Sequence, residues 1–156
     1  MIEIDIPGYG ELRIQNLVCD YSGTLSVDGK LINGVYERLN QLSDHLDIYI
    51  ITADTHGRVS EEIKGLKCNL TKIDAGYEHL QKEQFIVELG PDSSMALGNG
   101  ANDRKMLKVA KVGIAICLDE GISTRAILGS DIVVNSITEA LDLLLKPNRL
   151  IATLRY

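Results

Sequence analysis

The sequence Asp20-Tyr21-Ser22-Gly23-Thr24-Leu25 directly follows an apolar run at residues 14–19. An acidic residue therefore stands where a predicted buried strand breaks into a glycine-containing turn. In open α/β sheets ligands bind outside the carboxyl ends of the strands, so the Asp20 side chain is expected to face the crevice and not the core. A carboxylate in this place can attack phosphorus, while Gly23 and Thr24 offer a tight turn with backbone N–H groups for phosphoryl oxygens. An aspartate that only caps the following segment fits this short stretch equally well.

Two later apolar runs end in polar loops of the same kind. Residues 46–51 precede Thr52-Ala53-Asp54, and residues 94–97 precede Gly98-Asn99-Gly100-Ala101-Asn102-Asp103. Lys82 lies between these loops, at the start of an amphipathic stretch at residues 83–89. The chain therefore carries hydroxyl, cationic and acidic side chains at three further places that could meet Asp20.

Each of these polar residues also has an ordinary interpretation. Thr52 would serve as a helix cap, Lys82 as a solvated helix residue and Asp103 as a favourable charge in the first turn of its helix. Gly98 and Gly100 would then only build a turn. The occurrence of all of them in this order, after the first loop, favours a functional site.

Short strands and helices alternate along the chain. Residues 2–6 and 11–14 predict an opening hairpin, and residues 25–32 predict a second one around Asp28-Gly29. We expect helices at about residues 33–45, 55–64, 77–89, 102–109, 123–128 and 137–145, and strands at 48–51, 69–73, 94–97, 112–117 and 132–134. Such alternation indicates an α/β fold with a doubly wound, mainly parallel sheet.

Two details of this pattern concern the ends of elements. Asn33 is expected to cap the helix that begins after it. The apolar tail at residues 150–154 is interpreted as extended and buried against the chain's own sheet, with an added edge strand or an oligomer contact as alternatives.

Together, the four polar elements resemble the motifs of the haloacid dehalogenase-like (HAD) superfamily, in the same order and over nearly the whole chain. Asp20 to Leu25 resembles its nucleophile motif, Thr52 its hydroxyl motif, Lys82 its basic motif and Gly98 to Asp103 its metal motif. Within the superfamily, the phosphorylation domain of P-type ATPases is the most similar, with the motifs D-K-T-G-T, T-G-D and G-D-G-x-N-D. No run approaches the roughly twenty apolar residues of a membrane helix, so the chain looks like a soluble relative and not a pump.

The resemblance implies a Rossmann-like domain over residues 1–156, with the hairpin at 25–32 as a flap over the site. The gaps between Asp20, Thr52 and Lys82 are filled by the fold's own elements, which leaves no room for a cap domain. An open site of this kind implies a phosphorylated substrate, either a small molecule or a macromolecule. It also implies a possible homo-oligomer in which a neighbouring subunit lends a lid.

The resemblance also assigns a role to each site residue. Asp20 would be the nucleophile, Thr52 would bind the phosphate, and Lys82 would pair with both the phosphate and the nucleophile. Further contacts with the phosphorylated substrate are expected from the loop residues Ser22, Gly23, Thr24, Ala53 and Asn102. Mg²⁺ would be the cofactor, with oxygen ligands from Asp20, the Ser22 backbone carbonyl, Asn99 and Asp103.

Two positions depart from the pattern of the superfamily's phosphatases. Ser22 replaces an aspartate that protonates the leaving group and then activates water, help that is typically worth about 10² to 10⁴ in rate. Hydrolysis is therefore expected to be slow and to favour substrates with good leaving groups. Asn99 replaces a second aspartate, which removes one charge from the magnesium site. Weaker metal affinity follows.

Composition narrows the alternatives. The chain has 156 residues, 45% of them hydrophobic, and a formal net charge of −6 with scattered cations, so a general nucleic-acid surface is not expected. The three cysteines, Cys19, Cys68 and Cys117, have no C-x-x-C spacing and are interpreted as reduced core residues. The N-terminus carries no signal-peptide pattern, and a cytoplasmic location without a membrane partner is expected.

Two hypotheses of different class follow from the sequence. The first is a magnesium-dependent phosphohydrolase or phosphotransferase that passes through an aspartyl phosphate on Asp20. The second is a degenerate relative that binds a ligand or a partner without turnover, which Ser22 and Asn99 suggest. A dinucleotide-binding module is disfavoured because no G-x-G-x-x-G follows the first buried strand.

Overall fold

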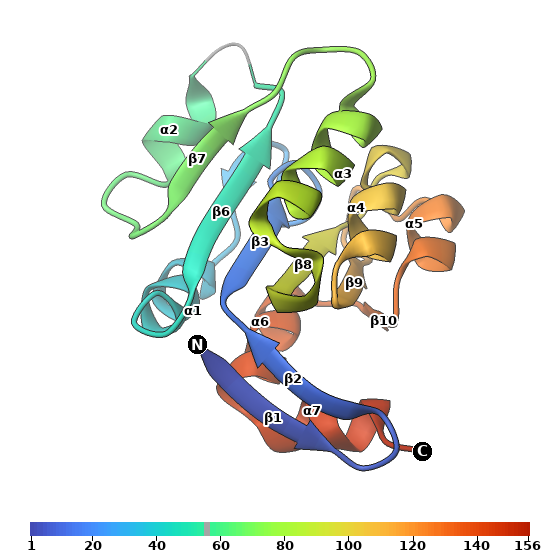
Figure 1. The fold of residues 1–156 in the computed structure, drawn as a ribbon. Coiled ribbons are helices and arrows are strands. Elements are labelled where there is room, and N and C mark those ends of the chain that lie inside the picture. The colour runs from blue at the N-terminus through green and yellow to red at the C-terminus, as the bar shows by residue number, and fades with distance from the viewer. Residues whose placement is uncertain (55–56) are drawn as a thin grey trace.

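A central sheet of six parallel strands organises the molecule (Figure 1). The structure is a computed structural model, and it describes residues 1–54 and 57–156. The strand order is β10-β9-β8-β3-β6-β7, so the first strand of the sheet in the chain, β3, lies near its middle. The strands are β3 (Asn16–Asp20), β6 (Asp47–Thr52), β7 (Asn69–Lys72), β8 (Ser94–Gly98), β9 (Val112–Ile116) and β10 (Ile132–Val134).

Helices cover both faces of this sheet, as the alternation in the sequence predicted (Figure 1). One hydrophobic core lies between the sheet and α3, α4 and α5, and a larger one lies under α1 and α6. The helices are α1 (Val35–Leu42), α2 (Arg58–Glu62), α3 (Glu78–Leu89), α4 (Arg104–Val109), α5 (Thr124–Gly129) and α6 (Ile137–Leu145), with 3₁₀ turns η1 (Pro91–Ser93) and η2 (Ala101–Asp103). Of the helix predicted at 55–64, residues 55 and 56 lie outside the described part, and α2 covers residues 58–62.

The central strand shows why the apolar runs were continuous. All five residues of β3 are buried. Leu17 and Cys19 contribute to the larger core, whereas Val18 between them contributes to the smaller one. Because successive side chains of a strand point to opposite faces, a strand covered on both sides needs apolar residues at every position.

Both predicted hairpins are present. β1 (Ile2–Ile6) pairs antiparallel with β2 (Gly10–Ile14) as a separate two-stranded ribbon. β4 (Ser26–Val27) pairs with β5 (Lys30–Leu31) and forms the expected flap after the Asp20 loop. Asp28 and Gly29 both have positive φ, 51° and 80°, which is the backbone of the favoured two-residue hairpin turn.

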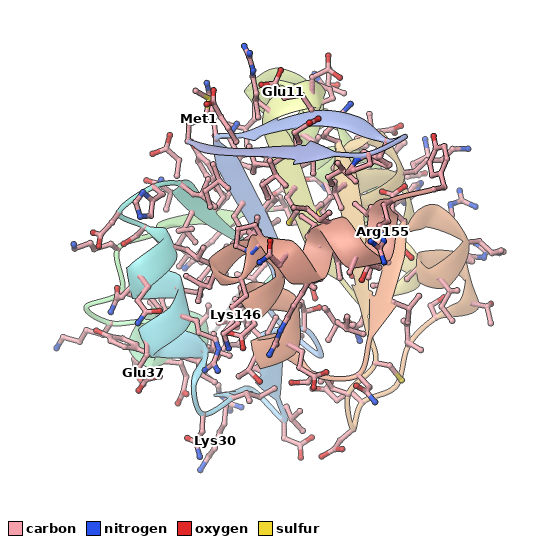
Figure 2. All side chains as sticks on the ribbon, turned by 90° about the horizontal axis from the view of Figure 1, so that it is seen from below. Met1, Glu11, Lys30, Glu37, Lys146 and Arg155 are labelled. Atoms are coloured by element: carbon pink, nitrogen blue, oxygen red, sulfur yellow. The ribbon has the colours of Figure 1, made fainter. Side chains whose placement is uncertain are left out.

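The interpretation of the tail as extended was wrong, because residues 147–154 form helix α7 (Pro147–Leu154). Proline with its fixed φ is well suited to the first turn of a helix, so Pro147 ends α6 and also starts α7. Leu150 is fully buried, and α7 packs against β1. Figure 2 shows α7 between Lys146 and Arg155, next to the hairpin that carries Glu11.

Smaller expectations were also corrected. Gly34 with φ 87°, and not Asn33, occupies the N-cap of α1, and no side chain caps that helix. All three cysteines are free, but only Cys19 is fully buried, while Cys68 and Cys117 are partly exposed. Within the described residues, no helix combines the length and the apolar character needed to cross a bilayer.

Candidate active site

Three neighbouring strands bring the polar loops to one edge of the sheet. Asp20 is the last residue of β3, Thr52 the last of β6 and Gly98 the last of β8. β3 pairs in parallel with both β6 and β8, so the three carboxyl ends lie side by side. The Asp20 loop, the Thr52 loop and the metal-type loop therefore surround one crevice, as the rule for open α/β sheets predicts.

Lys82 joins two of these loops through buried ion pairs. Its Nζ lies 2.7 Å from Asp20 Oδ1 and 2.6 Å from Asp103 Oδ1. Only 2% of the Lys82 residue is exposed, although it lies in the middle of helix α3 and not on its solvent face. Moving a lysine ammonium group and two carboxylates out of water costs desolvation free energy, which an exposed lysine does not have to overcome. The interpretation of Lys82 as a solvated helix residue is thus excluded.

The charge balance of this cluster is negative, because two carboxylates share one ammonium group. Burial, and after it the Asp103 carboxylate, raises the pKa of Asp20 to about 7 despite the opposing effect of Lys82. Burial alone would lower the pKa of Lys82, but the two carboxylates raise it above its usual range, so this side chain stays protonated. The site would therefore be stabilised by one more positive charge.

Hydrogen bonds fix the remaining groups around Asp20. The Thr24 hydroxyl donates to Asp20 Oδ2 at 3.0 Å and lies 3.2 Å from the amide oxygen of Asn99. Asn99 in turn donates to the Gly121 carbonyl. Asp103 Oδ2 accepts from the backbone N–H groups of Asn99 and Gly100, at 3.0 and 2.8 Å. The metal-type loop is thus folded around the Asp103 carboxylate.

A cavity of about 490 Å³ opens at this edge of the sheet. Seven of the residues predicted for the site line it, namely Asp20, Ser22, Thr52, Ala53, Lys82, Asn99 and Asn102. They come from four different segments of the chain, so the structure brings together what the sequence order suggested. The Thr52 hydroxyl accepts from the Asp54 backbone N–H at 3.1 Å, and Asp54 also lines the cavity.

The other three predicted residues, Gly23, Thr24 and Asp103, lie behind the cavity wall. The backbone N–H of Gly23 donates to the Ser26 carbonyl and that of Thr24 donates to the Tyr21 carbonyl. These two N–H groups, which the sequence analysis offered to phosphoryl oxygens, are thus engaged within the loop. Gly23 has φ 76°, and a Cβ there would overlap the Asn99 side chain, so glycine lets the two loops approach. Asp103 is fully buried and holds Lys82.

Sequence reasoning missed two charged residues of the cavity, Arg58 and Glu78. Arg58 begins α2, just after the Thr52 loop. Glu78 accepts from the Asn102 side chain at 2.6 Å. The sequence did contain a signal for Glu78, because Glu78 stands four residues before Lys82 and therefore shares its helix face.

The donor set suits a divalent cation. Among the described residues no three His, Cys, Asp or Glu side chains cluster as a metal site. Asp20, the Asn99 amide oxygen and the Ser22 backbone carbonyl would nevertheless offer the hard oxygen atoms that Mg²⁺ prefers, and Asp103 is fully buried next to Lys82. Mg²⁺ usually binds through one or two carboxylates and keeps several waters, so a larger acidic cluster is not required. The negative balance of the cluster fits the same ion.

No family model matches this chain. Solved structures resemble it over most of its length. A magnesium, phosphate and KDO complex of 3-deoxy-D-manno-octulosonate 8-phosphate phosphatase from Moraxella catarrhalis is similar with a TM-score of 0.65 and 21% identity, over 91% of this chain and 94% of that one. The cobalt-bound deoxy-D-mannose-octulosonate 8-phosphate phosphatase from Haemophilus influenzae gives a TM-score of 0.70 and 12% identity, over 92% and 94%.

A protein described as a HAD family hydrolase, from Streptomyces avermitilis, is similar as well, with a TM-score of 0.70 and 19% identity over 87% of each chain. The fold is therefore the HAD-like fold, and the described residues contain no cap domain. At the level of sequence, the uncharacterized protein MJ0073 from Methanocaldococcus jannaschii is 46% identical over 84 residues, which are 51% of this chain and 90% of that protein. The chain belongs to the same family as MJ0073.

Proposed function

We propose that the protein is a magnesium-dependent phosphohydrolase or phosphotransferase that works through an aspartyl phosphate on Asp20. The observation that carries this proposal is the buried Lys82, which bridges Asp20 and Asp103 at the carboxyl ends of adjacent strands. A lysine in this place holds the nucleophile and offers its remaining N–H to a phosphoryl oxygen, as phosphoryl transfer requires positioning and charge neutralisation. The superfamily's phosphatases among the structural neighbours support the reaction class.

The steps follow from the chain's own groups. One Asp20 carboxylate oxygen forms a bond to phosphorus while the bond from phosphorus to the leaving-group oxygen breaks. Lys82 and the Thr52 hydroxyl would hold the phosphoryl oxygens, and Thr24 keeps Asp20 oriented. Water, or another acceptor hydroxyl, then attacks phosphorus, loses its proton to solvent and releases the Asp20 carboxylate. Mg²⁺, when bound, would reduce the repulsion between Asp20 and the phosphoryl oxygens.

Ser22 should make this reaction slow. Ser22 lines the cavity at the sequence position where the superfamily's phosphatases carry an aspartate that protonates the leaving group, and serine does not supply that proton at neutral pH. Leaving groups that depart as stable anions, such as nitrophenolate or a carboxylate, need no such proton. The substrate class is therefore a phosphorylated molecule with a good leaving group, small or macromolecular, with sugar phosphates reacting more slowly.

The test is phosphatase activity toward p-nitrophenyl phosphate, with 5 to 10 mM Mg²⁺ and with EDTA, for the unmodified protein and for Asp20→Asn. We expect activity only in the unmodified protein with Mg²⁺. Acid quenching during turnover of ³²P-labelled acetyl phosphate should trap label on the protein and not on Asp20→Asn. Activity that survives Asp20→Asn would refute the covalent mechanism.

A second candidate is a binding protein without turnover. Ser22 and Asn99 favour it, because together they remove one proton donor and one metal-site charge from the superfamily's phosphatase pattern. A folded protein that shows no phosphatase or phosphotransferase activity with Mg²⁺, yet binds phosphate or a phosphate analogue, would select this alternative.

A further inference from the structure

A second cavity, of about 710 Å³, lies between helices α3, α4 and α5, and we call it the α4–α5 groove. It is larger than the active-site cavity, and among the described residues the two share no lining residue. The three helices lie together on one face of the sheet, with α5 toward the β10 edge (Figure 1). The groove is lined by Glu83, Arg104, Lys105, Lys108, Val109, Arg125, Leu128 and Gly129.

The groove is cationic in an otherwise acidic protein. It holds four cations and one carboxylate, a formal charge of +3, whereas the whole chain carries −6. The carboxylate, Glu83, pairs with Lys105 at 2.8 Å. Among the described residues, no carboxylate forms an ion pair with Arg104, Lys108 or Arg125. These three cations therefore attract an anionic ligand without first having to break a partner contact.

Apolar side chains stand among these cations. Leu128 is 85% exposed, and Val109 is partly exposed beside it in the groove. Gly129 lets α5 approach α4, because a Cβ at this position would lie 2.5 Å from the Arg104 carbonyl oxygen. Leucines with this exposure are unusual as part of a pocket wall, and an apolar side chain within a polar rim is typical of protein interfaces.

We propose that the α4–α5 groove binds an acidic segment of a partner protein, with an aliphatic side chain of that segment against Leu128 and Val109. Charge complementarity selects the acidic partner, and Leu128 selects one that brings an apolar group as well. A small inorganic anion would leave Leu128 exposed. Two copies of the chain facing each other through this groove would oppose like charges, and single-stranded nucleic acid would find no aromatic side chain in the lining for base stacking.

The probe is a fluorescein-labelled twelve-residue peptide of alternating Glu and Leu, with the full-length protein titrated against it in a fluorescence-polarisation assay. We expect saturable binding that weakens as salt rises. The double variant Arg104→Glu with Lys108→Glu should weaken binding at least tenfold, and Leu128→Ser should weaken it several-fold. The matched control, Lys30→Glu with Arg155→Glu, makes the same charge change at exposed positions outside the groove, both labelled in Figure 2. It should bind like the unmodified protein.

Four outcomes would overturn the proposal. They are absence of binding by the unmodified protein, equal weakening in the control double variant, equal affinity for a peptide with every Leu replaced by Ser, and tighter groove-dependent binding of a single-stranded oligonucleotide or of anionic vesicles. A folded Asp20→Asn variant should bind the peptide unchanged, which separates this proposal from the proposed catalytic function. Circular dichroism spectra of all variants establish that each is folded.

Discussion

At the scale of single residues, Ser22 is the side chain that would limit the rate of the proposed phosphoryl transfer. Its backbone continues the Asp20 loop, its residue lines the cavity, and its hydroxyl cannot act as the proton donor that many phosphoryl transfers use. The loop around it is otherwise complete, with Thr24 bound to Asp20 and Lys82 in place. A change of this one side chain should therefore alter proton donation without altering how the other site residues are held.

Ser22→Asp should therefore raise the turnover of phosphate esters with poor leaving groups. We expect kcat for a sugar phosphate to increase by about 10²-fold, with a smaller effect on p-nitrophenyl phosphate, whose leaving group needs no proton. The measurement is phosphate release from both substrates with saturating Mg²⁺. Ser22→Asn is the control for size, and an equal gain in that variant would contradict the role of the proton.

Loss of the Lys82 ammonium group should destabilise the fold strongly. Lys82→Met leaves the buried Asp20 and Asp103 carboxylates without their shared cation. Removing one partner of a buried ion cluster typically costs about 3–5 kcal/mol. We expect a loss of this order in the free energy of unfolding, measured by urea titration without Mg²⁺ at pH 8.

Lys105→Met is the matched control, because Lys105 lies on the neighbouring helix and pairs with Glu83 while about a third of each side chain remains exposed. Partly exposed pairs of this kind are worth roughly 0–1 kcal/mol. If both variants lost the same small amount, the Lys82 cluster would not contribute to stability as its burial suggests.

At the scale of elements, a three-cation cluster joins α6 to its neighbours. Asp142 on α6 binds Arg38 of α1 at 2.8 Å and Lys146 at 2.7 Å, with Arg149 of α7 at 3.5 Å. The Asp142 residue is mostly buried. The cluster links α1, α6 and α7 on the face of the sheet away from α3 and α4. Hydrogen bonds from Lys146, and then from Arg38, lower the pKa of the Asp142 carboxyl below its usual range.

This shift predicts a pH-dependent contribution to stability. The folded-state pKa lies below the unfolded one, so the contribution is complete above the unfolded value of about 3.9 and is lost as the pH falls through the folded value. Asp142→Asn should lower the free energy of unfolding by about 1–2 kcal/mol at pH 7, and the difference from the unmodified protein should shrink toward pH 2. Urea unfolding at both pH values measures it. Asp44→Asn removes an exposed pair with Lys67 and should change little at either pH.

Elements also show what the sequence could and could not predict. The strands that end in Asp20, Thr52 and Gly98 were predictable because a strand covered on both faces is apolar at every position. Helix α7 was not, because Leu150 and Leu154 fit an extended tail as well as a helix until the packing against β1 is known. The burial of Lys82 likewise depends on how α3 packs on the sheet, and a local sequence pattern does not show that packing.

At the scale of the whole molecule, the candidate site exists because the sheet gathers distant segments. Ser22, Thr52, Lys82 and Asn99 are separated by up to 77 positions in the chain and line one cavity. The order of the motifs therefore predicted seven of the residues that line this cavity, while Arg58 and Glu78 were found only from the three-dimensional arrangement. The predicted homo-oligomer stays a prediction, because it depends on surfaces that only a second copy could test.

Because the site forms only when distant segments come together in the fold, we also expect magnesium binding to stabilise the whole fold. A ligand that binds only the folded state stabilises it by RT ln(1 + [L]/Kd), which for a Kd of about 1 mM gives roughly 1.4 kcal/mol at 10 mM ligand. For a chain of this size we expect the melting temperature to rise by about 3–6 °C with 10 mM MgCl₂ relative to EDTA. Differential scanning fluorimetry measures this shift.

Two variants test whether this shift in melting temperature comes from the site. They change carboxylates at opposite ends of strand β8. Asp103 follows the strand in the metal-type loop, whereas the exposed Asp92 precedes it in η1. Asp103→Asn should abolish the magnesium-dependent rise, because it removes one of the two charges that make the buried cluster negative. Asp92→Asn should retain the rise in full. A rise of equal size in both variants would place the bound ion elsewhere on this acidic protein and would remove the metal from the proposed mechanism.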